Sequence, residues 1–354
     1  MNKVELTAED LRFNPPSFSK QTILEAVDNF YGLSGVLKPL SGERDQNHLL
    51  TSADGAKYVV KVAGPDEARD VVDYQIKVLR HIEDKIPEVN VPHNLKTLDE
   101  RDFAIVNSPS GQPHILRILS FIDGVPFGEE RQPSLDVIYD AGRFQGTLCA
   151  ALSDFSHPSE GYFMPWDISQ GLVLNPAILS SKYGDVERLI APLIDHFKSH
   201  VLPKMATLRK QTIHNDAHTG NMLKSAPDAD DFNGLIDFGD IAYAPVIQDL
   251  SIPLTRFISG SLDPFAAGAA YVKGFTSVYP LFPEELDILY DLILLRAALT
   301  VQLIDFRIRN DDANLQELIE LYPSLVTMLE KLISLDRDAL TEAFHQASNN
   351  GVKK

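Results

Sequence analysis

Cysteine is almost absent from this chain of 354 residues, which contains Cys149 alone. One cysteine cannot form a disulfide within the chain, and it cannot build a zinc site from several thiolates. The sequence also lacks an apolar run of about eighteen residues, the length that a membrane-spanning helix needs, and an apolar signal-peptide stretch at its N-terminus. These absences predict a soluble, cytoplasmic protein.

Basic residues are scarce relative to acidic ones. The chain has 32 Lys and Arg residues against 50 Asp and Glu residues, so its formal net charge is −18. A negative field opposes approach to nucleic-acid phosphates and anionic membranes, whereas it attracts small cations. The charge therefore predicts a small cationic substrate, with no nucleic-acid and no membrane partner. It leaves open whether two copies form a homodimer.

Strand-like patterns fill the first third of the chain. Apolar residues make up 44% of the sequence and charged residues 23%, which is typical of a folded globular protein. Short runs between about Gly35 and Val106 predict strands, two of which flank the turn signal Asp54-Gly55. They are followed by a predicted amphipathic helix, "DEARDVVDYQIKVLRHIEDKI", and by two more predicted strands, "FAIV" and "HILRILSFI".

The rest of the chain has helical patterns. Asp123-Gly124 and Pro126 interrupt the strand pattern, and the amphipathic segments that follow are residues 134–155, 185–208, 284–306 and 314–335. We therefore predict an α+β fold, with a small β-rich N-terminal lobe in residues 1–122 and a larger, mainly helical C-terminal lobe in residues 123–354. Two lobes of this kind are a known arrangement for phosphoryl transfer.

The densest group of polar residues is "TIHNDAHTGNML", residues 212–223. Three interpretations are open. His214, Asp216 and His218 can together bind the metal of a hydrolase. Alternatively, Asp216 and Asn221 have the D-x-x-x-x-N spacing of a phosphoryl-transfer loop, or the segment is a polar turn without a catalytic task.

Two further residues favour phosphoryl transfer. Asp237 ends an apolar run in "GLIDFGD", where a second magnesium-binding carboxylate is needed. Lys61 is the charge inside the apolar run of "KYVVKVA", where it can neutralise nucleotide phosphates. A metal hydrolase leaves Asn221, Lys61 and the two-lobed pattern unexplained.

Four segments point to one protein family: "HNDAHTGNML", "GLIDFGDIAYAPVIQDLSI", "LSGERDQNHLL" and "YVVKVA". They resemble the aminoglycoside phosphotransferase and choline kinase-like superfamily, and within it the hydroxylysine kinase-like proteins most of all. The resemblance covers nearly the whole chain, roughly from Leu33 to Arg296. It implies a two-lobed protein kinase-like fold and the cofactors Mg²⁺ and ATP or GTP.

The resemblance also implies roles for residues of the C-terminal lobe. Asp216 is the catalytic base or orients the acceptor hydroxyl, and Asn221 and Asp237 bind magnesium. His214 is an architectural residue bonded to backbone near Asp237, and Asp249 braces the catalytic segment.

For the N-terminal lobe, the resemblance implies a nucleotide site. Lys61 binds phosphate, and the loop from Ser41 to Asn47 covers the nucleotide, with Ser41 and Asn47 placed to cap the phosphates. The hinge contacts adenine through the backbone around Ser120, Phe121 and Ile122.

The sequence departs from the family pattern at two positions. Asn215 stands where glycine is frequent, and asparagine tolerates the positive φ of such a turn better than most residues. The helix residue that faces Lys61 is predicted to be Gln75, with Asp73 two positions earlier, rather than the usual glutamate. A neutral partner holds a lysine less strongly, which keeps open a nucleotide-binding pseudokinase with a regulatory role.

The function predicted from the sequence is that of a small-molecule kinase. It transfers the γ-phosphate of ATP or GTP to a hydroxyl of a small amine or amino acid, and the resemblance favours a hydroxylysine-like acceptor. The expected substrate is thus small, cationic and hydroxylated. The pseudokinase and the metal hydrolase are the alternatives, and the roles of His218 and Asp240 stay open. Arg296, inside an apolar helix, is either a buried ion-pair partner or a clamp for a substrate carboxylate.

Overall fold

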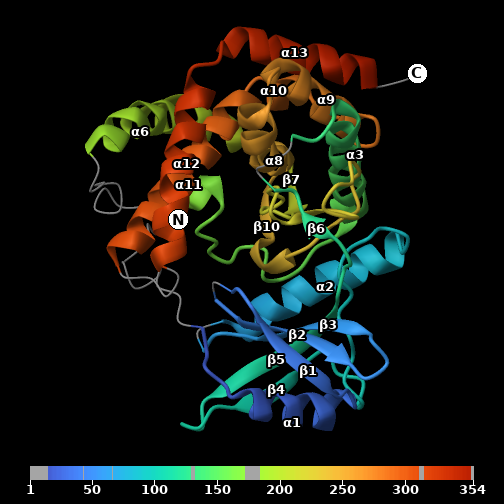
Figure 1. Ribbon diagram of the computed structural model, residues 1–354. Helices are drawn as coiled ribbons and strands as arrows, with labels where there is room; N and C mark the ends of the chain where they lie inside the picture. Colours follow the sequence, from blue (N-terminus) through green and yellow to red (C-terminus); the bar gives the residue numbers. More distant parts are fainter. Residues whose placement is uncertain are drawn as a thin grey trace. The chain divides into compact units, whose positions relative to one another are not determined.

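The computed structural model describes residues 15–42, 44–65, 67–128, 132–171, 184–310 and 315–351 (Figure 1). The chain divides into two compact units, an N-terminal unit that ends at Asp123 and a C-terminal unit that begins at Gly124. This division lies one residue beyond the predicted lobe boundary. No helix in the described ranges is long and apolar enough to cross a membrane.

The N-terminal unit is built on an antiparallel sheet of five strands in the order β1-β2-β3-β5-β4. Gly55 has a φ of 86° in the turn between β2 and β3, a conformation that favours glycine. The predicted strands are all present: β1 (Gly35–Leu40), β2 (Gln46–Ser52), β3 (Lys57–Val62), β4 (Ala104–Asn107) and β5 (Pro113–Ser120).

Two helices, α1 (Lys20–Tyr31) and α2 (Arg69–Lys85), cover opposite faces of this sheet (Figure 1). Val60 and Val62 of β3 pack in the same apolar cluster as residues of α1. Because side chains alternate along a strand, Lys61 points to the face that α2 covers. The main apolar core of this unit therefore lies on the α1 side of the sheet, opposite the face from which Lys61 projects.

The sequence analysis missed α1. The Ser19 hydroxyl accepts a hydrogen bond from the Thr22 N–H at 3.1 Å, so Ser19 caps the N-terminus of the helix. Gly32 follows the last turn with a φ of 65°. Serine before a helix and glycine after it are both common end signals, which the sequence therefore contained.

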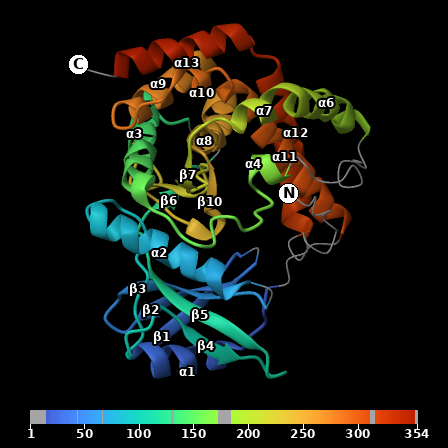
Figure 2. The same cartoon turned by 180° about the vertical axis from the view of Figure 1, so that it is seen from behind.

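Helices make up most of the C-terminal unit, which Figure 2 shows from behind. They are α3 (Leu135–Ala151), α4 (Ile168–Gly171), α6 (Gly184–His196), α7 (Leu202–Met205), α8 (Val246–Gly260), α9 (Pro264–Thr276), α10 (Pro283–Leu286), α11 (Leu289–Arg309), α12 (Leu315–Ile333) and α13 (Arg337–Gly351). A π turn at Phe197–Val201 separates α6 from α7, so the helix predicted over residues 185–208 is interrupted. The sequence analysis did not predict α8, α9 or α13.

Two small antiparallel sheets in this unit flank the loops that contain the predicted site residues. One pairs β7 (Lys210–Ile213) with β10 (Ala242–Pro245). The other contains β6 (Val125–Pro126), β8 (Met222–Lys224) and β9 (Gly234–Leu235) in the order β6-β8-β9. Residues 214–221 form the loop between β7 and β8, and Asp237 lies between β9 and β10.

Helices α3 and α9 approach closely enough to require glycine at their contact. A Cβ atom on Gly142 would lie 2.2 Å from the Tyr271 carbonyl oxygen, and one on Gly274 would lie 2.0 Å from the Tyr139 carbonyl oxygen. From this contact the Tyr271 hydroxyl donates to Gln145 Oε1 at 2.6 Å. The packing therefore orients Gln145, whose Nε2 donates to the backbone of α8.

Candidate active site

Residues 214–221, which the sequence predicts to be the catalytic loop and which keep that name below, are joined to the segment around Asp237 by backbone hydrogen bonding. The Ile236 N–H donates to the Asn221 carbonyl oxygen at 3.0 Å, next to the pairing of β8 with β9. Asp216 and Asp237 both lie near enough to His214 to act on its pKa. The structure thus brings three of the predicted site residues, Asp216, Asn221 and Asp237, into one region of the C-terminal unit.

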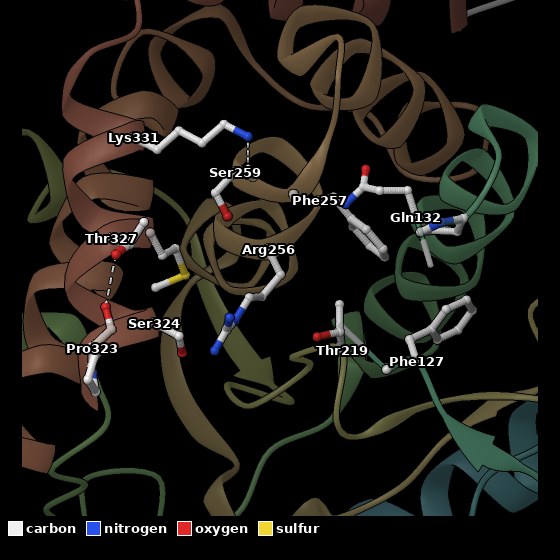
Figure 3. A pocket seen from close by; sticks show the side chains of 14 residues that line it. Phe127, Gln132, Thr219, Arg256, Phe257, Ser259, Pro323, Ser324, Thr327 and Lys331 are labelled. Carbon is white, nitrogen blue, oxygen red and sulfur yellow. Dashed lines mark hydrogen bonds between the residues drawn. The ribbon is translucent and has the colours of Figure 1, made fainter. Parts of the chain in front are cut away.

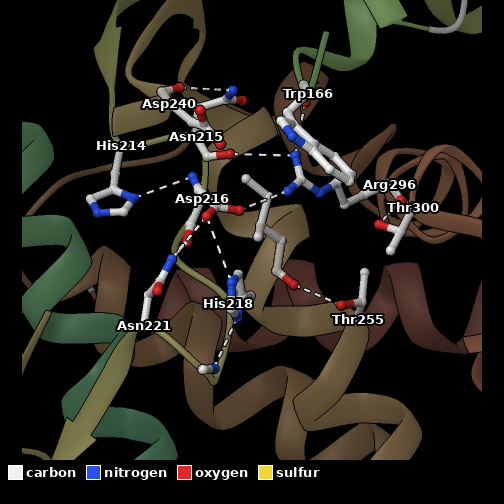
Figure 4. A network of polar contacts seen from close by, with 12 residues as sticks. Trp166, His214, Asn215, Asp216, His218, Asn221, Asp240, Thr255, Arg296 and Thr300 are labelled. Atoms are coloured by element: carbon white, nitrogen blue, oxygen red, sulfur yellow. Dashed lines mark hydrogen bonds and ion pairs between the residues drawn. The ribbon is translucent and has the colours of Figure 1, made fainter. Parts of the chain in front are cut away.

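The Asp216 carboxylate is held at both oxygens (Figure 4). Arg296 Nη2 donates to Oδ1 at 3.0 Å, and Asn221 Nδ2 donates to Oδ2 at 2.8 Å. His218 Nε2 lies 3.6 Å from Oδ2, but the His218 side chain is nearly half exposed. A carboxylate restrained on both sides has a defined orientation, which a base or hydroxyl-orienting group requires.

Asn221 has a fixed amide orientation. Its Nδ2 also donates to the Asp216 carbonyl oxygen at 2.9 Å, in addition to the carboxylate. With both donor hydrogens directed to Asp216, the amide oxygen is the end of the side chain available to a metal ion. An amide oxygen here and a carboxylate at Asp237 are the hard oxygen ligands that Mg²⁺ prefers, so these residues fit the expected ion.

His214 is architectural. Its Nδ1 accepts a hydrogen bond from the Asp216 N–H at 3.2 Å, and its Nε2 donates to the Ile236 carbonyl oxygen at 3.2 Å. Burial lowers the pKa of His214 to about 4, although the carboxylates of Asp216 and Asp237 oppose this shift. The ring is therefore neutral near pH 7, and neither nitrogen is free for a metal.

These contacts argue against the metal hydrolase. His214, Asp216 and His218 do not converge on one point, because both ring nitrogens of His214 are used within the loop. Across the described ranges, no three His, Cys, Asp or Glu side chains are placed to hold a metal together. The kinase arrangement needs only Asn221 and Asp237 as protein ligands.

The backbone of the catalytic loop turns at Asn215, which has a φ of 63°. Its N–H donates to Asp249 Oδ1 of α8 at 2.8 Å, and its side chain binds the Asp240 carbonyl oxygen and the Gln248 amide. Burial raises the pKa of Asp249 to about 6, against the lowering effect of hydrogen bonds from the backbone of Asn215 and His214. Asn215 therefore adopts the predicted conformation, and Asp249 braces the loop.

Asp237 also has a positive φ, of 63°. Its Oδ1 accepts a hydrogen bond from the Gly239 N–H at 3.3 Å. This local bond offsets part of the cost of the left-handed backbone, which is unfavourable for residues other than glycine. Asp237 lies two residues beyond the end of β9, at the N-terminus of the short 3-10 turn Phe238–Asp240.

Arg296 of α11 makes contacts whose partners could not be predicted from the sequence. Nη1 donates to the carbonyl oxygens of Trp166 and Asn215 at 2.8 and 3.3 Å, and the guanidinium carbon lies 5.2 Å from the centre of the Trp166 ring. The Arg296 side chain is only 6% exposed. Of the two roles that the sequence left open for Arg296, the structure shows the buried ion pair, and its partner is Asp216 itself.

The phosphate-binding candidate Lys61 lies in the N-terminal unit. Its Nζ is 3.3 Å from Asp45 Oδ2, and both side chains are largely buried. Asn47 is opposite Lys61 in the β2–β3 pairing, and its Nδ2 donates to the Ser41 carbonyl oxygen at 3.1 Å. Asp45 and Asn47 therefore lie beside Lys61, and Asp45 is a partner that was not predicted from the sequence.

Gln75 of α2 contacts a second buried cation. Its Oε1 accepts a hydrogen bond from Arg117 Nη2 at 2.5 Å, and its Nε2 lies 3.4 Å from Glu67 Oε1. Arg117 is opposite Lys61 in the β3–β5 pairing, so both cations are on the face of the sheet that α2 covers. Arg117 is the charge inside "HILRILS", and the signal that singled out Lys61 would also have found it.

The hinge segment is held to neighbouring backbone. The Ser120 N–H donates to the His93 carbonyl oxygen at 2.9 Å, and the Phe121 N–H donates to the Lys57 carbonyl oxygen at 3.4 Å. Among the described residues, the Ile122 N–H donates to no backbone carbonyl oxygen. Of the three predicted hinge residues, Ile122 therefore has the N–H that the surrounding backbone does not use.

The fold and the site together define the class of protein. A small antiparallel sheet covered by two helices, and a helical unit with a D-x-x-x-x-N loop and an Asp-Phe-Gly segment, are the parts of a two-lobed protein kinase-like phosphotransferase. Residues 36–280 match the family described as "Phosphotransferase enzyme family". The chain belongs to this family and is a small-molecule phosphotransferase with an alcohol group as acceptor.

Named relatives and solved structures agree with this assignment. Hydroxylysine kinase from Danio rerio is 23% identical over 347 residues, which cover 94% of this chain and 96% of the relative. The structure of amicoumacin kinase hAmiN with AMP-PNP, Ca²⁺ and Ami matches with a TM-score of 0.69 at 15% identity, covering 93% and 97% of the two chains. A microcompartment-associated aminopropanol kinase matches with a TM-score of 0.57 at 17% identity, covering 94% and 95%. The predicted fold class is confirmed.

Proposed function

We propose that this phosphotransferase moves the γ-phosphoryl group of ATP or GTP to a hydroxyl of a small amine or amino acid, with a hydroxylysine-like acceptor favoured. The observation that carries the proposal is the restrained Asp216 carboxylate, with Arg296 on Oδ1 and Asn221 on Oδ2. The relative named hydroxylysine kinase, which aligns over nearly its whole length, supports the acceptor. The net charge of −18 favours an acceptor that carries ammonium groups.

The two units supply different groups in this proposal. Asn221 and Asp237 of the C-terminal unit would hold Mg²⁺, which neutralises charge on the phosphates when it is bound. The N-terminal unit would supply the nucleotide contacts, from Lys61, Ser41, Asn47 and the hinge segment Ser120, Phe121 and Ile122. Gln75 would contribute by orienting Arg117 and Glu67 beside the same sheet face.

Asp216 has the central chemical role. Its carboxylate would accept the hydrogen bond of the acceptor hydroxyl, align the oxygen for in-line attack, and take the proton as the new oxygen–phosphorus bond forms. A carboxylate that receives hydrogen bonds from both Arg296 and Asn221 has a fixed direction relative to the loop. Its main contribution is therefore orientation, in keeping with phosphoryl transfer by positioning and charge stabilisation.

Asp216→Asn tests this role, because it keeps the shape of the side chain and removes its charge. We expect a fall in kcat of about 100-fold or more, with nucleotide affinity nearly unchanged. The matched control is Asp140→Asn, at an exposed residue of α3 that forms an ion pair with Arg143 at 3.7 Å. Near-normal turnover by Asp216→Asn would rule out the proposed catalytic residue.

The same assay distinguishes the pseudokinase. Purified protein with Mg²⁺, ATP or GTP, and a panel of amino alcohols and hydroxylated amino acids should yield a phosphorylated acceptor. Nucleotide binding without turnover of any acceptor would overturn the proposal in favour of a regulatory nucleotide-binding protein. Hydrolysis that needs no nucleotide would instead support a hydrolase.

A further inference from the structure

Trp166 is the only tryptophan of the chain, and its backbone is joined to the catalytic loop (Figure 4). The carbonyl oxygens of Trp166 and Asn215 both accept hydrogen bonds from Arg296 Nη1, at 2.8 and 3.3 Å. The other terminal nitrogen of the same guanidinium, Nη2, donates to Asp216 Oδ1. One arginine side chain therefore fixes Trp166 beside the carboxylate that orients the acceptor hydroxyl in the proposed function.

The residue that follows Trp166 holds this segment in place. Asp167 is buried, and its carboxylate accepts hydrogen bonds from Gln170 Nε2 at 2.7 Å and from Gln248 Nε2 at 3.0 Å. Gln248 Nε2 also donates to Asn215 Oδ1 at 3.0 Å, so one residue of α8 links this segment to the catalytic loop. A segment that is anchored in this way needs little reorganisation when it binds a ligand.

The indole N–H of Trp166 has no hydrogen-bond acceptor in the part of the chain that the structure describes. The Trp166 ring is partly buried, with the Arg296 guanidinium carbon 5.2 Å from its centre. The N–H itself is not enclosed by protein, so it is accessible to solvent. Because a tryptophan N–H usually finds a partner when the ring is buried, this donor is available to a ligand.

A pocket of about 480 Å³ also borders the catalytic loop (Figure 3). Thr219 of the loop forms part of its wall, together with apolar residues that include Phe257 and Met328. Its described lining residues include neither Asp216 nor Trp166. Because the reacting hydroxyl must meet the Asp216 carboxylate, the acceptor site has to include the side of the loop on which Trp166 lies.

The chemistry of the acceptor limits what the Trp166 N–H can bind. An indole N–H donates hydrogen bonds and cannot accept them, and an ammonium group has no lone pair to receive one. A donor on the reacting hydroxyl oxygen would compete for the lone pair that attacks phosphorus. In a hydroxylated amino acid, the carboxylate oxygens are the acceptors that remain.

We propose that Trp166 determines the specificity of the acceptor site, because its indole N–H donates a hydrogen bond to the carboxylate of a hydroxylated amino acid. This inference rests on the proposed function, since it assigns a binding group for that same acceptor. The Arg296 guanidinium compensates the charge of Asp216, so a second carboxylate can approach the ring. The ammonium groups of the acceptor supply the long-range attraction to a protein with a net charge of −18.

Binding can be followed by fluorescence, because all tryptophan emission of the chain comes from Trp166. L-lysine has the carboxylate and ammonium groups of hydroxylysine but no hydroxyl, and 1,5-diaminopentane lacks the carboxylate as well. Titration of the full chain with L-lysine should change the emission saturably. The diamine should bind about 10-fold more weakly, as expected for loss of a hydrogen bond to a charged group. Equal affinities, or no saturable change with L-lysine, would overturn the inference.

Trp166→Phe keeps an aromatic ring and the backbone carbonyl that Arg296 binds, but it removes the N–H. The KM for hydroxylysine should rise about 10-fold, whereas kcat and the nucleotide KM should not change. The KM for decarboxylated hydroxylysine should be the same in both proteins, which a general disturbance of the site would not produce. The matched control is Tyr139→Phe, at a partly buried residue of α3, which removes an O–H from a ring and should leave each KM unchanged.

The two tests separate this inference from the proposed function. Phosphorylation of hydroxylysine with the same KM by wild type and Trp166→Phe would overturn the role of the indole N–H and leave the kinase proposal intact. Saturable binding of L-lysine, reported by Trp166, without phosphorylation of any acceptor would support the carboxylate site and overturn the proposed function.

Discussion

Replacing Arg296 by methionine should separate orientation of the catalytic aspartate from stability of the fold. Methionine keeps a long apolar side chain beside Trp166, but it removes the hydrogen bond to Asp216 Oδ1 and the two bonds to the carbonyl oxygens of Trp166 and Asn215. Asp216 then keeps only its contact with Asn221 as a firm restraint. We expect its carboxylate to rotate away from the acceptor hydroxyl.

The expected loss of stability follows from the burial of the Arg296–Asp216 ion pair and from the number of hydrogen bonds that Arg296→Met removes. Removing one partner of a buried ion pair costs about 3–5 kcal/mol, whereas a single hydrogen bond to a charged group contributes about 1.5–3 kcal/mol. The Asp216 side chain retains 16% exposure, so water can replace part of the lost contact. We therefore expect unfolding free energy to fall by about 3 kcal/mol, the lower end of the buried-pair range.

The fall in kcat should be larger than the loss of stability alone explains. A displacement of the reacting group by about 1 Å can reduce kcat about 100-fold, while the nucleotide KM should change little. Arg296→Lys keeps the charge but cannot bind Asp216 and both carbonyl oxygens at once, so its kcat should be intermediate. Steady-state kinetics with urea unfolding of each variant measures both quantities. A folded Arg296→Met protein with wild-type kcat would refute the orienting role.

Other predictions concern the metal and the pH dependence. Asp237→Ala should weaken Mg²⁺-dependent nucleotide binding as well as turnover, because a metal ligand is lost, and an unchanged Mg²⁺ dependence in a nucleotide titration would contradict this role. His214, whose pKa falls from 6.5 to about 4, contributes stability that is present above pH 6.5 and lost toward pH 4. The stability gap between wild type and His214→Gln should therefore widen by about 3 kcal/mol from pH 4 to pH 7. The pKa of Asp249 rises from 3.8 to about 6, so its contribution to stability changes with pH in the opposite direction. Relative to Asp249→Asn, the wild type should lose about 3 kcal/mol as pH rises through the same window, and parallel stability curves for both variants and the wild type would refute these pKa assignments.

Local patterns in the sequence were sufficient to predict the N-terminal strands and the residues that make up the catalytic loop. These patterns are the alternation of apolar and polar residues, the Asp54-Gly55 turn and the amphipathic face of α2. Each involves residues that are close together in the sequence, so it can be recognised without knowing what packs against it. The D-x-x-x-x-N spacing is also local, and the contact between Asp216 and Asn221 lies within one loop. The role of Asn215 could be predicted for the same reason, since a positive φ is a property of a single residue.

Tertiary packing decided the features that join distant segments. Helix α8 buries residues around most of its circumference, so it has no polar face whose spacing would reveal a helix. Arg296 is 80 residues from Asp216, and Asp249 is 34 residues from Asn215, so neither contact can be predicted from neighbouring sequence. In the N-terminal unit, the register of β3 with β5 sets Arg117 beside Lys61. A buried charge shows that some partner must exist, but which partner it meets depends on how separate elements pack.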